Sequence, residues 1–201
     1  MKKILTYIIL PLLIVALAYF SFKSIEKPIS FERDKTAREA ICIERMKEIR
    51  TLQVAYKSVY NKFTADVDSL INFYKYDSII VVKQVGSWDD SVAVAQKRVY
   101  RDTIKIPVRD TLLKDARASV DSIAFIPYSG GKRMIMRSVV AKVSGVDVPL
   151  FEAAAPFDIL LNGLERQLIV NLKSERRRMN KYEGLKVGSV DAPNNNAGNW
   201  E

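Results

Sequence analysis

The sequence predicts an α+β fold with an N-terminal transmembrane helix, a long amphipathic helix, a small antiparallel sheet and a C-terminal helix. An apolar run without a charged residue opens the chain, and apolar residues then recur every three or four positions to about residue 63. Beyond residue 77, short β-branched segments between turn residues indicate strands. We divide the chain into a basic N-terminus (1–3), a transmembrane signal-anchor (4–22), a linker (23–30), an α+β domain (31–187) and a C-terminal loop tail (188–201).

The apolar run of residues 4–22 has the length of a membrane span. A helix rises about 1.5 Å per residue, so the run approaches the thickness of a bilayer's hydrocarbon core, about 30 Å. The alternative is a signal peptide cleaved after Ala18, because Ala16-Leu17-Ala18 fits a small-residue cleavage site. The run continues past that site to Phe22, so we expect a retained anchor that contacts membrane lipid.

The charges on either side of the run bear on its orientation. Lys2 and Lys3 favour a cytoplasmic N-terminus, which would place a single-pass, bitopic protein in the bacterial inner (cytoplasmic) membrane with its domain in the periplasm. Basic residues also follow the run, beginning at Lys23, and the positive-inside rule counts these too. A domain on the cytoplasmic side therefore stays open as an alternative.

Composition excludes several kinds of chemistry. The 201 residues contain no histidine, which removes Ser-His-Asp and Cys-His catalysis and the usual zinc sites. The single cysteine, Cys42, cannot form an internal disulfide. We therefore expect no enzyme, no cofactor and no bound metal. The alternative is a membrane-tethered enzyme that uses carboxylates, serine or lysine, with Asp89, Asp90 and Ser129 as the candidates.

The chain has a formal net charge of +9, and five of its basic residues lie close together near the C-terminus. We expect these residues to be solvated or to lie at the C-terminal end of a helix, where cations are favourable. The alternative is a surface for anionic lipid or nucleic acid on the cytoplasmic side, although we do not expect nucleic acid as a partner. The residues are Lys173, Arg176, Arg177, Arg178 and Lys181.

Residues 31–63 read as one amphipathic helix, separated from the anchor by a break at Pro28. Four of its apolar residues repeat at intervals of seven, which suits a coiled-coil face for self-association or for a protein partner. The alternative is that this face packs on its own domain. The four residues are Cys42, Ile49, Tyr56 and Phe63.

The sequence also places the remaining elements. Thr64 or Asp66 could cap a second, shorter helix. We expect strands at 78–83 and 103–108, the second at an edge because of Pro107, and strands at 123–128 and 133–143 around a tight turn at residues 129–132. Residues 86–101 could be a loop followed by a short helix. Pro156 begins the pattern of the C-terminal helix, whose apolar face reaches Leu172, and the chain reads as loop from Gly188.

This plan resembles type IV pilins and type II secretion pseudopilins. An apolar helix is followed by an amphipathic helix containing Ile49-Arg-Thr-Leu-Gln-Val-Ala-Tyr-Lys-Ser-Val-Tyr-Asn-Lys-Phe63 and then by strands, and the end Ala197-Gly198-Asn199-Trp200-Glu201 is similar to the Gly-Asn-Trp ending of major pseudopilins. The resemblance implies an assembly subunit, and calcium in the C-terminal loop near Asp191.

The chain departs from that family at its N-terminus. Only Met1-Lys2-Lys3 precedes the apolar run, without the Gly–Phe cleavage site, and the run contains no glutamate. Processing by a prepilin peptidase is therefore not implied. The plan is equally similar to the bitopic platform proteins of these machines. We expect a non-catalytic scaffold or assembly subunit, with the pilus or secretion-like machine left open.

Overall fold

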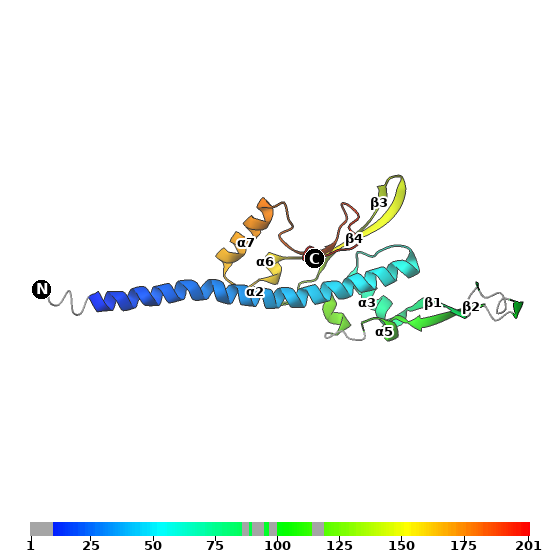
Figure 1. The fold of residues 1–201 in the computed structure, drawn as a ribbon, viewed down its shortest axis with the longest axis horizontal. Helices are drawn as coiled ribbons and strands as arrows, with labels where there is room; N and C mark the ends of the chain where they lie inside the picture. Colours follow the sequence, from blue (N-terminus) through cyan, green and yellow to red (C-terminus); the bar gives the residue numbers. More distant parts are fainter. Residues whose placement is uncertain (1–9, 86–88, 90–94, 97–99, 114–118) are drawn as a thin grey trace.

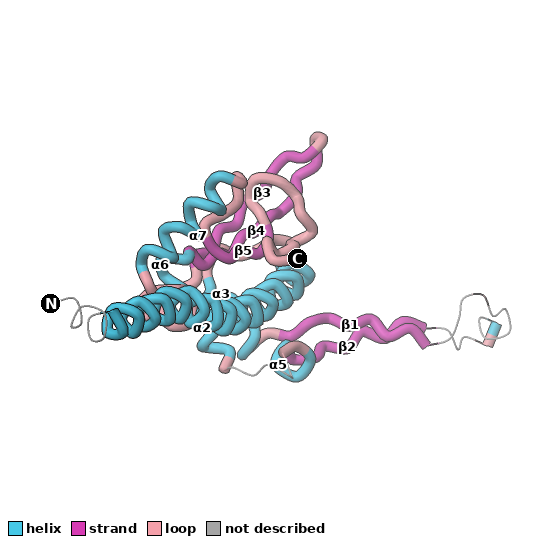
Figure 2. The backbone as a smooth tube through the Cα atoms, turned by 60° about the vertical axis from the view of Figure 1, so that its left-hand side comes forward, coloured by secondary structure: helices cyan, strands magenta, loops and turns pink. Residues whose placement is uncertain are grey.

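The computed structural model describes residues 10–85, 89, 95–96, 100–113 and 119–201, and its fold is α+β. A single long helix, α2, runs through the molecule, and its N-terminal half projects from the body (Figure 1). Two antiparallel sheets lie on opposite sides of α2 (Figure 1 and Figure 2). The predicted combination of a long helix, antiparallel strands and a C-terminal helix is therefore confirmed.

Helix α2 extends from Leu10 to Tyr60, 51 residues without interruption. The predicted break and linker at residues 23–30 are wrong, because the helix continues through Pro28. Proline lacks an N–H group and crowds the preceding turn, which costs about 3 kcal/mol in a helix. Here the segment is exposed, so water can reach the carbonyl of Ser24 that loses its helical donor, and no second breaker adds to the cost.

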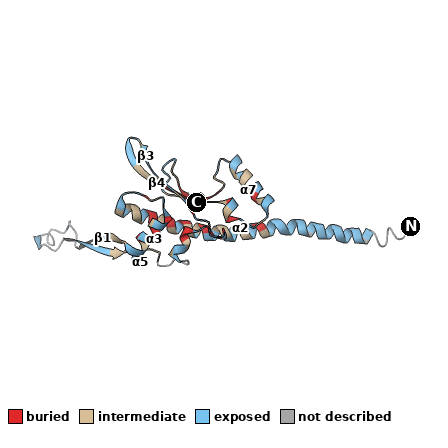
Figure 3. Ribbon diagram, turned by 180° about the vertical axis from the view of Figure 1, so that it is seen from behind, coloured by how far each residue is buried: buried red, intermediate tan, exposed pale blue. Residues whose placement is uncertain are grey.

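The two halves of α2 have different surroundings. Side chains before residue 30 are exposed wherever they are described, whereas one face is buried from Phe31 onward (Figure 3). This face forms the centre of the hydrophobic core. Its fully or nearly fully buried residues are Phe31, Cys42, Met46, Ile49, Leu52 and Gln53.

A buried amide fixes the turn after α2. The Gln53 side chain is completely buried, and its Nε2 donates to the carbonyl of Thr64 at 2.6 Å while the Thr64 amide donates to Gln53 Oε1 at 3.1 Å. The next helix, α3, spans Val67–Tyr76, and the Asp66 carboxylate accepts from the amides of its first turn. The predicted second helix and its Asp66 cap are confirmed.

Strands β1 (Ser78–Val85) and β2 (Tyr100–Pro107) form a two-stranded arm that extends away from the body (Figure 2). Both predicted strands are present, and each is longer than predicted. Most of the segment predicted at 86–101 lies outside the described residues. A short helix, α5 (Val108–Thr111), returns the chain to the core through the buried Val108.

The second sheet has the order β3-β4-β5, with β3 at Ile135–Val143, β4 at Val146–Pro156 and β5 at Gly184–Gly188. The strand predicted at 123–128 is wrong. The chain instead forms the short 3-10 helix η2 (Val120–Ala124) and a single bridge from Phe125 to Arg133. The predicted turn at 129–132 is present, but β3 takes the central strand β4 as its partner.

The C-terminal helix begins later than predicted. Pro156 precedes only one helical turn, α6 (Phe157–Leu160), and a turn with Gly163 at a φ of 85° then separates it from α7 (Arg166–Arg178). A residue with a side chain adopts that positive φ less readily than glycine does. The continuous apolar face therefore belongs to two helices joined by a corner.

We expect Gln53→Ala to destabilise the domain by about 1–3 kcal/mol, because it removes a completely buried amide and both hydrogen-bond partners of the half-buried Thr64 backbone. Tryptophan fluorescence during thermal unfolding of the full chain in detergent micelles measures the effect. The matched control is Gln167→Ala, since Gln167 is exposed and its side chain donates a hydrogen bond to the exposed Asn171. Equal melting temperatures for the two variants would contradict this role of Gln53.

Candidate functional site: the projecting half of the long helix

The projecting half of α2 is apolar on every side up to the first charged residue, Lys23. Leu12, Leu13, Ile14 and Val15 are consecutive and each is more than half exposed. Successive helical residues are rotated by about 100°, so four in a row cover the whole circumference. A helix that is apolar all round is typical of a buried position or a membrane span. The other large apolar residues exposed on this half are Leu10, Leu17, Tyr19, Phe20, Ile25 and Ile29.

The structure describes the predicted anchor from Leu10 onward. Among the helices of the described residues, none combines the length and the apolar character needed to cross a membrane.

The four residues predicted to bind a partner lie inside the domain. Cys42 and Ile49 are completely buried, Tyr56 packs edge-on against Phe73, and Phe63 lies 4.8 Å from the ring of Phe151 between centroids. Cys42, Ile49 and Phe63 are therefore covered by the domain itself, and the half-buried Tyr56 packs on the same core. A spacing of seven residues fits a helix packed on a globular core as well as a coiled coil.

Burial also determines the chemistry of the single cysteine. Removal from water disfavours the thiolate and raises the pKa of the Cys42 thiol to about 12, although Arg45 opposes the shift. The thiol is therefore neutral at physiological pH and a poor nucleophile.

Three arginines of α2 attach the helix to segments far away in the sequence. Arg38 donates to the carbonyls of Leu160 and Asn162, at 3.2 and 2.8 Å. Arg45 donates to the carbonyl of Phe125 at 2.6 Å. The guanidinium groups thereby satisfy carbonyls at turns and helix ends that have no partner within their own element.

The third of these arginines, Arg50, holds the C-terminus. Its Nη1 lies 2.7 Å from Glu201 Oε1 and also donates to the carbonyl of Asn196. Asn199 adds two side-chain hydrogen bonds to β5, and Trp200 packs against the core. The predicted loop tail is thus docked on the domain. The amide of Asn199 and the indole of Trp200 are the only hints of this in the sequence.

The basic residues near the C-terminus are in part neutralised. Lys173 forms ion pairs with Asp158 and Glu183, and Arg177 Nε lies 2.7 Å from Glu183 Oε1. The hydrogen bond from Arg177 is the main reason that the pKa of Glu183 is below its ordinary value. Arg176 lies over the ring of Phe157, so Arg178 and Lys181 are the remaining exposed members of the predicted set.

Among the described residues, the candidate catalytic and metal-binding side chains do not converge. Ser129 holds its turn, donating to the carbonyl of Ile126 and accepting from the amide of Lys132, whereas Asp89 is exposed and Asp90 lies outside the described residues. The carboxylate of Asp191 lies on an exposed loop. Within the described part of the chain, no three His, Cys, Asp or Glu side chains are placed to hold a metal ion together.

The chain matches no protein-family model, no curated protein sequence and no solved structure.

We expect Cys42 to resist N-ethylmaleimide in the folded chain and to react rapidly in denaturant, because the thiol is buried and neutral. Mass spectrometry of the labelled full chain measures the reaction. The matched control is C42A/A40C, which moves the thiol to an exposed position on the same helix. Comparable labelling rates of the native Cys42 chain and this control would exclude a buried Cys42.

The contact between Arg50 and Glu201 predicts a response to acid. The hydrogen bond from Arg50 lowers the pKa of Glu201. The ionised Glu201 therefore stabilises the fold fully above its ordinary pKa of 4.5, and this stabilisation is lost as the pH falls through the lowered pKa. In a W88F chain, Trp200 emission should shift to the red over this range. E201Q should show the shifted emission already at neutral pH, whereas E175Q should behave like the parent. Identical acid profiles for E201Q and the parent would contradict the contact.

Proposed function

We propose that this chain is a single-pass, membrane-anchored envelope protein whose non-catalytic α+β domain lies outside the cytoplasm and serves as a scaffold or assembly subunit. The single observation that carries the proposal is the division of α2. One uninterrupted helix is uncovered in its first half, which is apolar up to Lys23, and forms the centre of the domain core in its second half.

Burial of the exposed apolar side chains of α2 would be strongly favourable in free energy. Complete burial of one leucine, isoleucine, valine or phenylalanine side chain contributes about 1.5–3 kcal/mol. Nine such residues from Leu10 to Ile29 are each more than half exposed, and the net stability of a whole domain is only about 5–15 kcal/mol. Lipid, together with apolar helices of neighbouring subunits, would supply that cover.

The continuity of α2 supports an assembly role rather than a flexible tether. A helix without a break holds the domain in a fixed direction relative to the anchor, which suits a subunit that must present the same surface repeatedly. The resemblance to pilins, pseudopilins and bitopic platform proteins supports the same proposal through its general plan. We therefore propose a pilus-like or secretion-like machine as the setting.

The alternative of a basic domain on the cytoplasmic side has less support. It depends on the charged residues of α7, and the ion pairs of Lys173 and Arg177 with Asp158 and Glu183 compensate part of that charge. No observation favours the alternative of a tethered enzyme.

A C-terminal topology reporter together with cysteine crosslinking tests the proposal. In a C42A background, we expect Leu13→Cys to give crosslinked species in native membranes, because neighbouring apolar helices approach there, and the reporter to be active outside the cytoplasm. Ala40→Cys, at an exposed position on the part of α2 whose other face packs in the domain core, is the matched control. A reporter active only in the cytoplasm, or a chain recovered without membranes, would refute the anchoring. Absence of any crosslink at Leu13 would refute the assembly role.

A further inference from the structure

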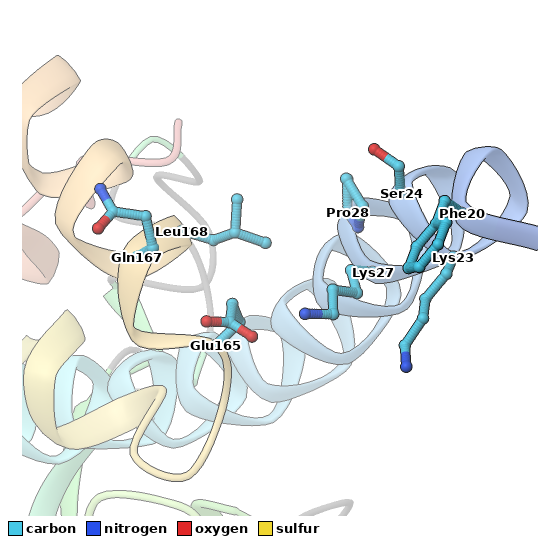
Figure 4. A pocket seen from close by; sticks show the side chains of 8 residues that line it. All are labelled: Phe20, Lys23, Ser24, Lys27, Pro28, Glu165, Gln167 and Leu168. Atoms are coloured by element: carbon cyan, nitrogen blue, oxygen red, sulfur yellow. The ribbon is translucent and has the colours of Figure 1, made fainter. Parts of the chain in front are cut away.

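A groove opens between α2 and the first turn of α7, where α2 leaves the domain (Figure 4). Its volume is about 430 Å³, within the range of pockets that hold small ligands. We call it the α2–α7 groove. Its lining includes Phe20, Lys23, Lys27 and Pro28 of α2, and Glu165 and Leu168 of α7.

The groove carries two lysines whose charge the domain does not neutralise. Lys23 and Lys27 are one helical turn apart and exposed, and within the described residues neither forms an ion pair. The Lys23 ammonium lies 5.7 Å from the ring centroid of Tyr19. Lys173 and Arg177 of α7, in contrast, are paired with carboxylates. The charge of the groove is therefore available to an anion.

Apolar side chains accompany the two charges. The Phe20 ring is 66% exposed at the end of the groove nearer the N-terminus, and Leu168 points from α7 toward α2 (Figure 4). Glu165 faces Lys27 from the opposite wall (Figure 4). A ligand that satisfies this lining has an apolar part next to Phe20 and one negative charge next to the lysines.

The position of the groove along α2 identifies where such a ligand would come from. Lys23 is the first charged residue after the apolar run 4–22. If this run occupies the hydrocarbon core, residues 23–27 lie at the level of the phosphate groups, where lysine side chains extend toward the interface.

We propose that the α2–α7 groove binds one anionic phospholipid, with its phosphodiester against Lys23 and Lys27 and the start of an acyl chain along Phe20 and Leu168. This inference rests on the proposed anchoring. Glu165 leaves the groove with one net positive charge, which matches a single phosphodiester better than a polyanionic head group. The head-group hydroxyls of phosphatidylglycerol can donate hydrogen bonds to that carboxylate.

Native mass spectrometry of the full chain in detergent micelles tests the proposal, with phosphatidylglycerol or phosphatidylcholine added as the probe. We expect the wild-type chain to retain one phosphatidylglycerol in preference to phosphatidylcholine. A lysine close to an anionic lipid contributes about a five-fold change in affinity, so K23Q/K27Q should weaken phosphatidylglycerol retention by about twenty-five-fold. The matched control is K62Q/K142Q, which removes two exposed lysines elsewhere on the domain.

Three results would overturn the inference: equal retention of the two lipids by the wild-type chain, equal loss in both double variants, or loss of a dimer rather than of lipid in K23Q/K27Q.

Sedimentation with phosphatidylcholine vesicles separates this inference from the proposed function. If the wild-type chain does not sediment, the anchoring itself fails. If the wild-type chain and K23Q/K27Q both sediment but neither selects phosphatidylglycerol, only the groove inference fails.

Discussion

The packing of one face of α2 is the constraint on which the rest of the structure depends. Met46, Ile49 and Leu52 are completely buried, and the same hydrophobic core includes residues of both sheets and of α3, α5, α6 and α7. The buried side of the β3-β4-β5 sheet joins this core through Phe151, Ala153 and Val187, whereas the β1–β2 arm joins it through Ile79. The arginines on the flanks of this face add polar contacts at the points where the surrounding segments turn.

The packing of α2 also removes one carboxyl group, that of Glu39, from water. Glu39 lies on α2 beneath α7, and burial raises the pKa of its carboxyl, with Lys35 and Arg176 acting in the opposite direction. Its Oε1 has no hydrogen-bond partner among the described residues. Glu39 thus interacts with Lys35 and Arg176 through their charges, without a hydrogen bond to its Oε1.

Local signals in the sequence were sufficient for elements whose partners are close in the chain. The periodicity of α2, the Asp66 cap of α3 and the two strands of the arm were all visible because each depends on its own residues.

The break at Pro28 was overestimated, because one proline does not end a helix that continues on both sides. The central strand β4 was missed, because three alanines and Pro149 give it a weak strand propensity. In the site, Lys23 and Lys27 could be read from the sequence, but the α7 wall that completes the groove is far away in the chain.

Because α2 is unbroken, it also connects the apolar segment directly to the domain. A helix of 51 residues is about 75 Å long, and its domain is fixed to the end opposite the apolar segment. Membrane-embedded helices change their tilt when the bilayer becomes thicker or thinner. Under the proposed anchoring, the unbroken helix would transmit such a tilt to the domain, so a change of membrane thickness would move the β1–β2 arm at the far end.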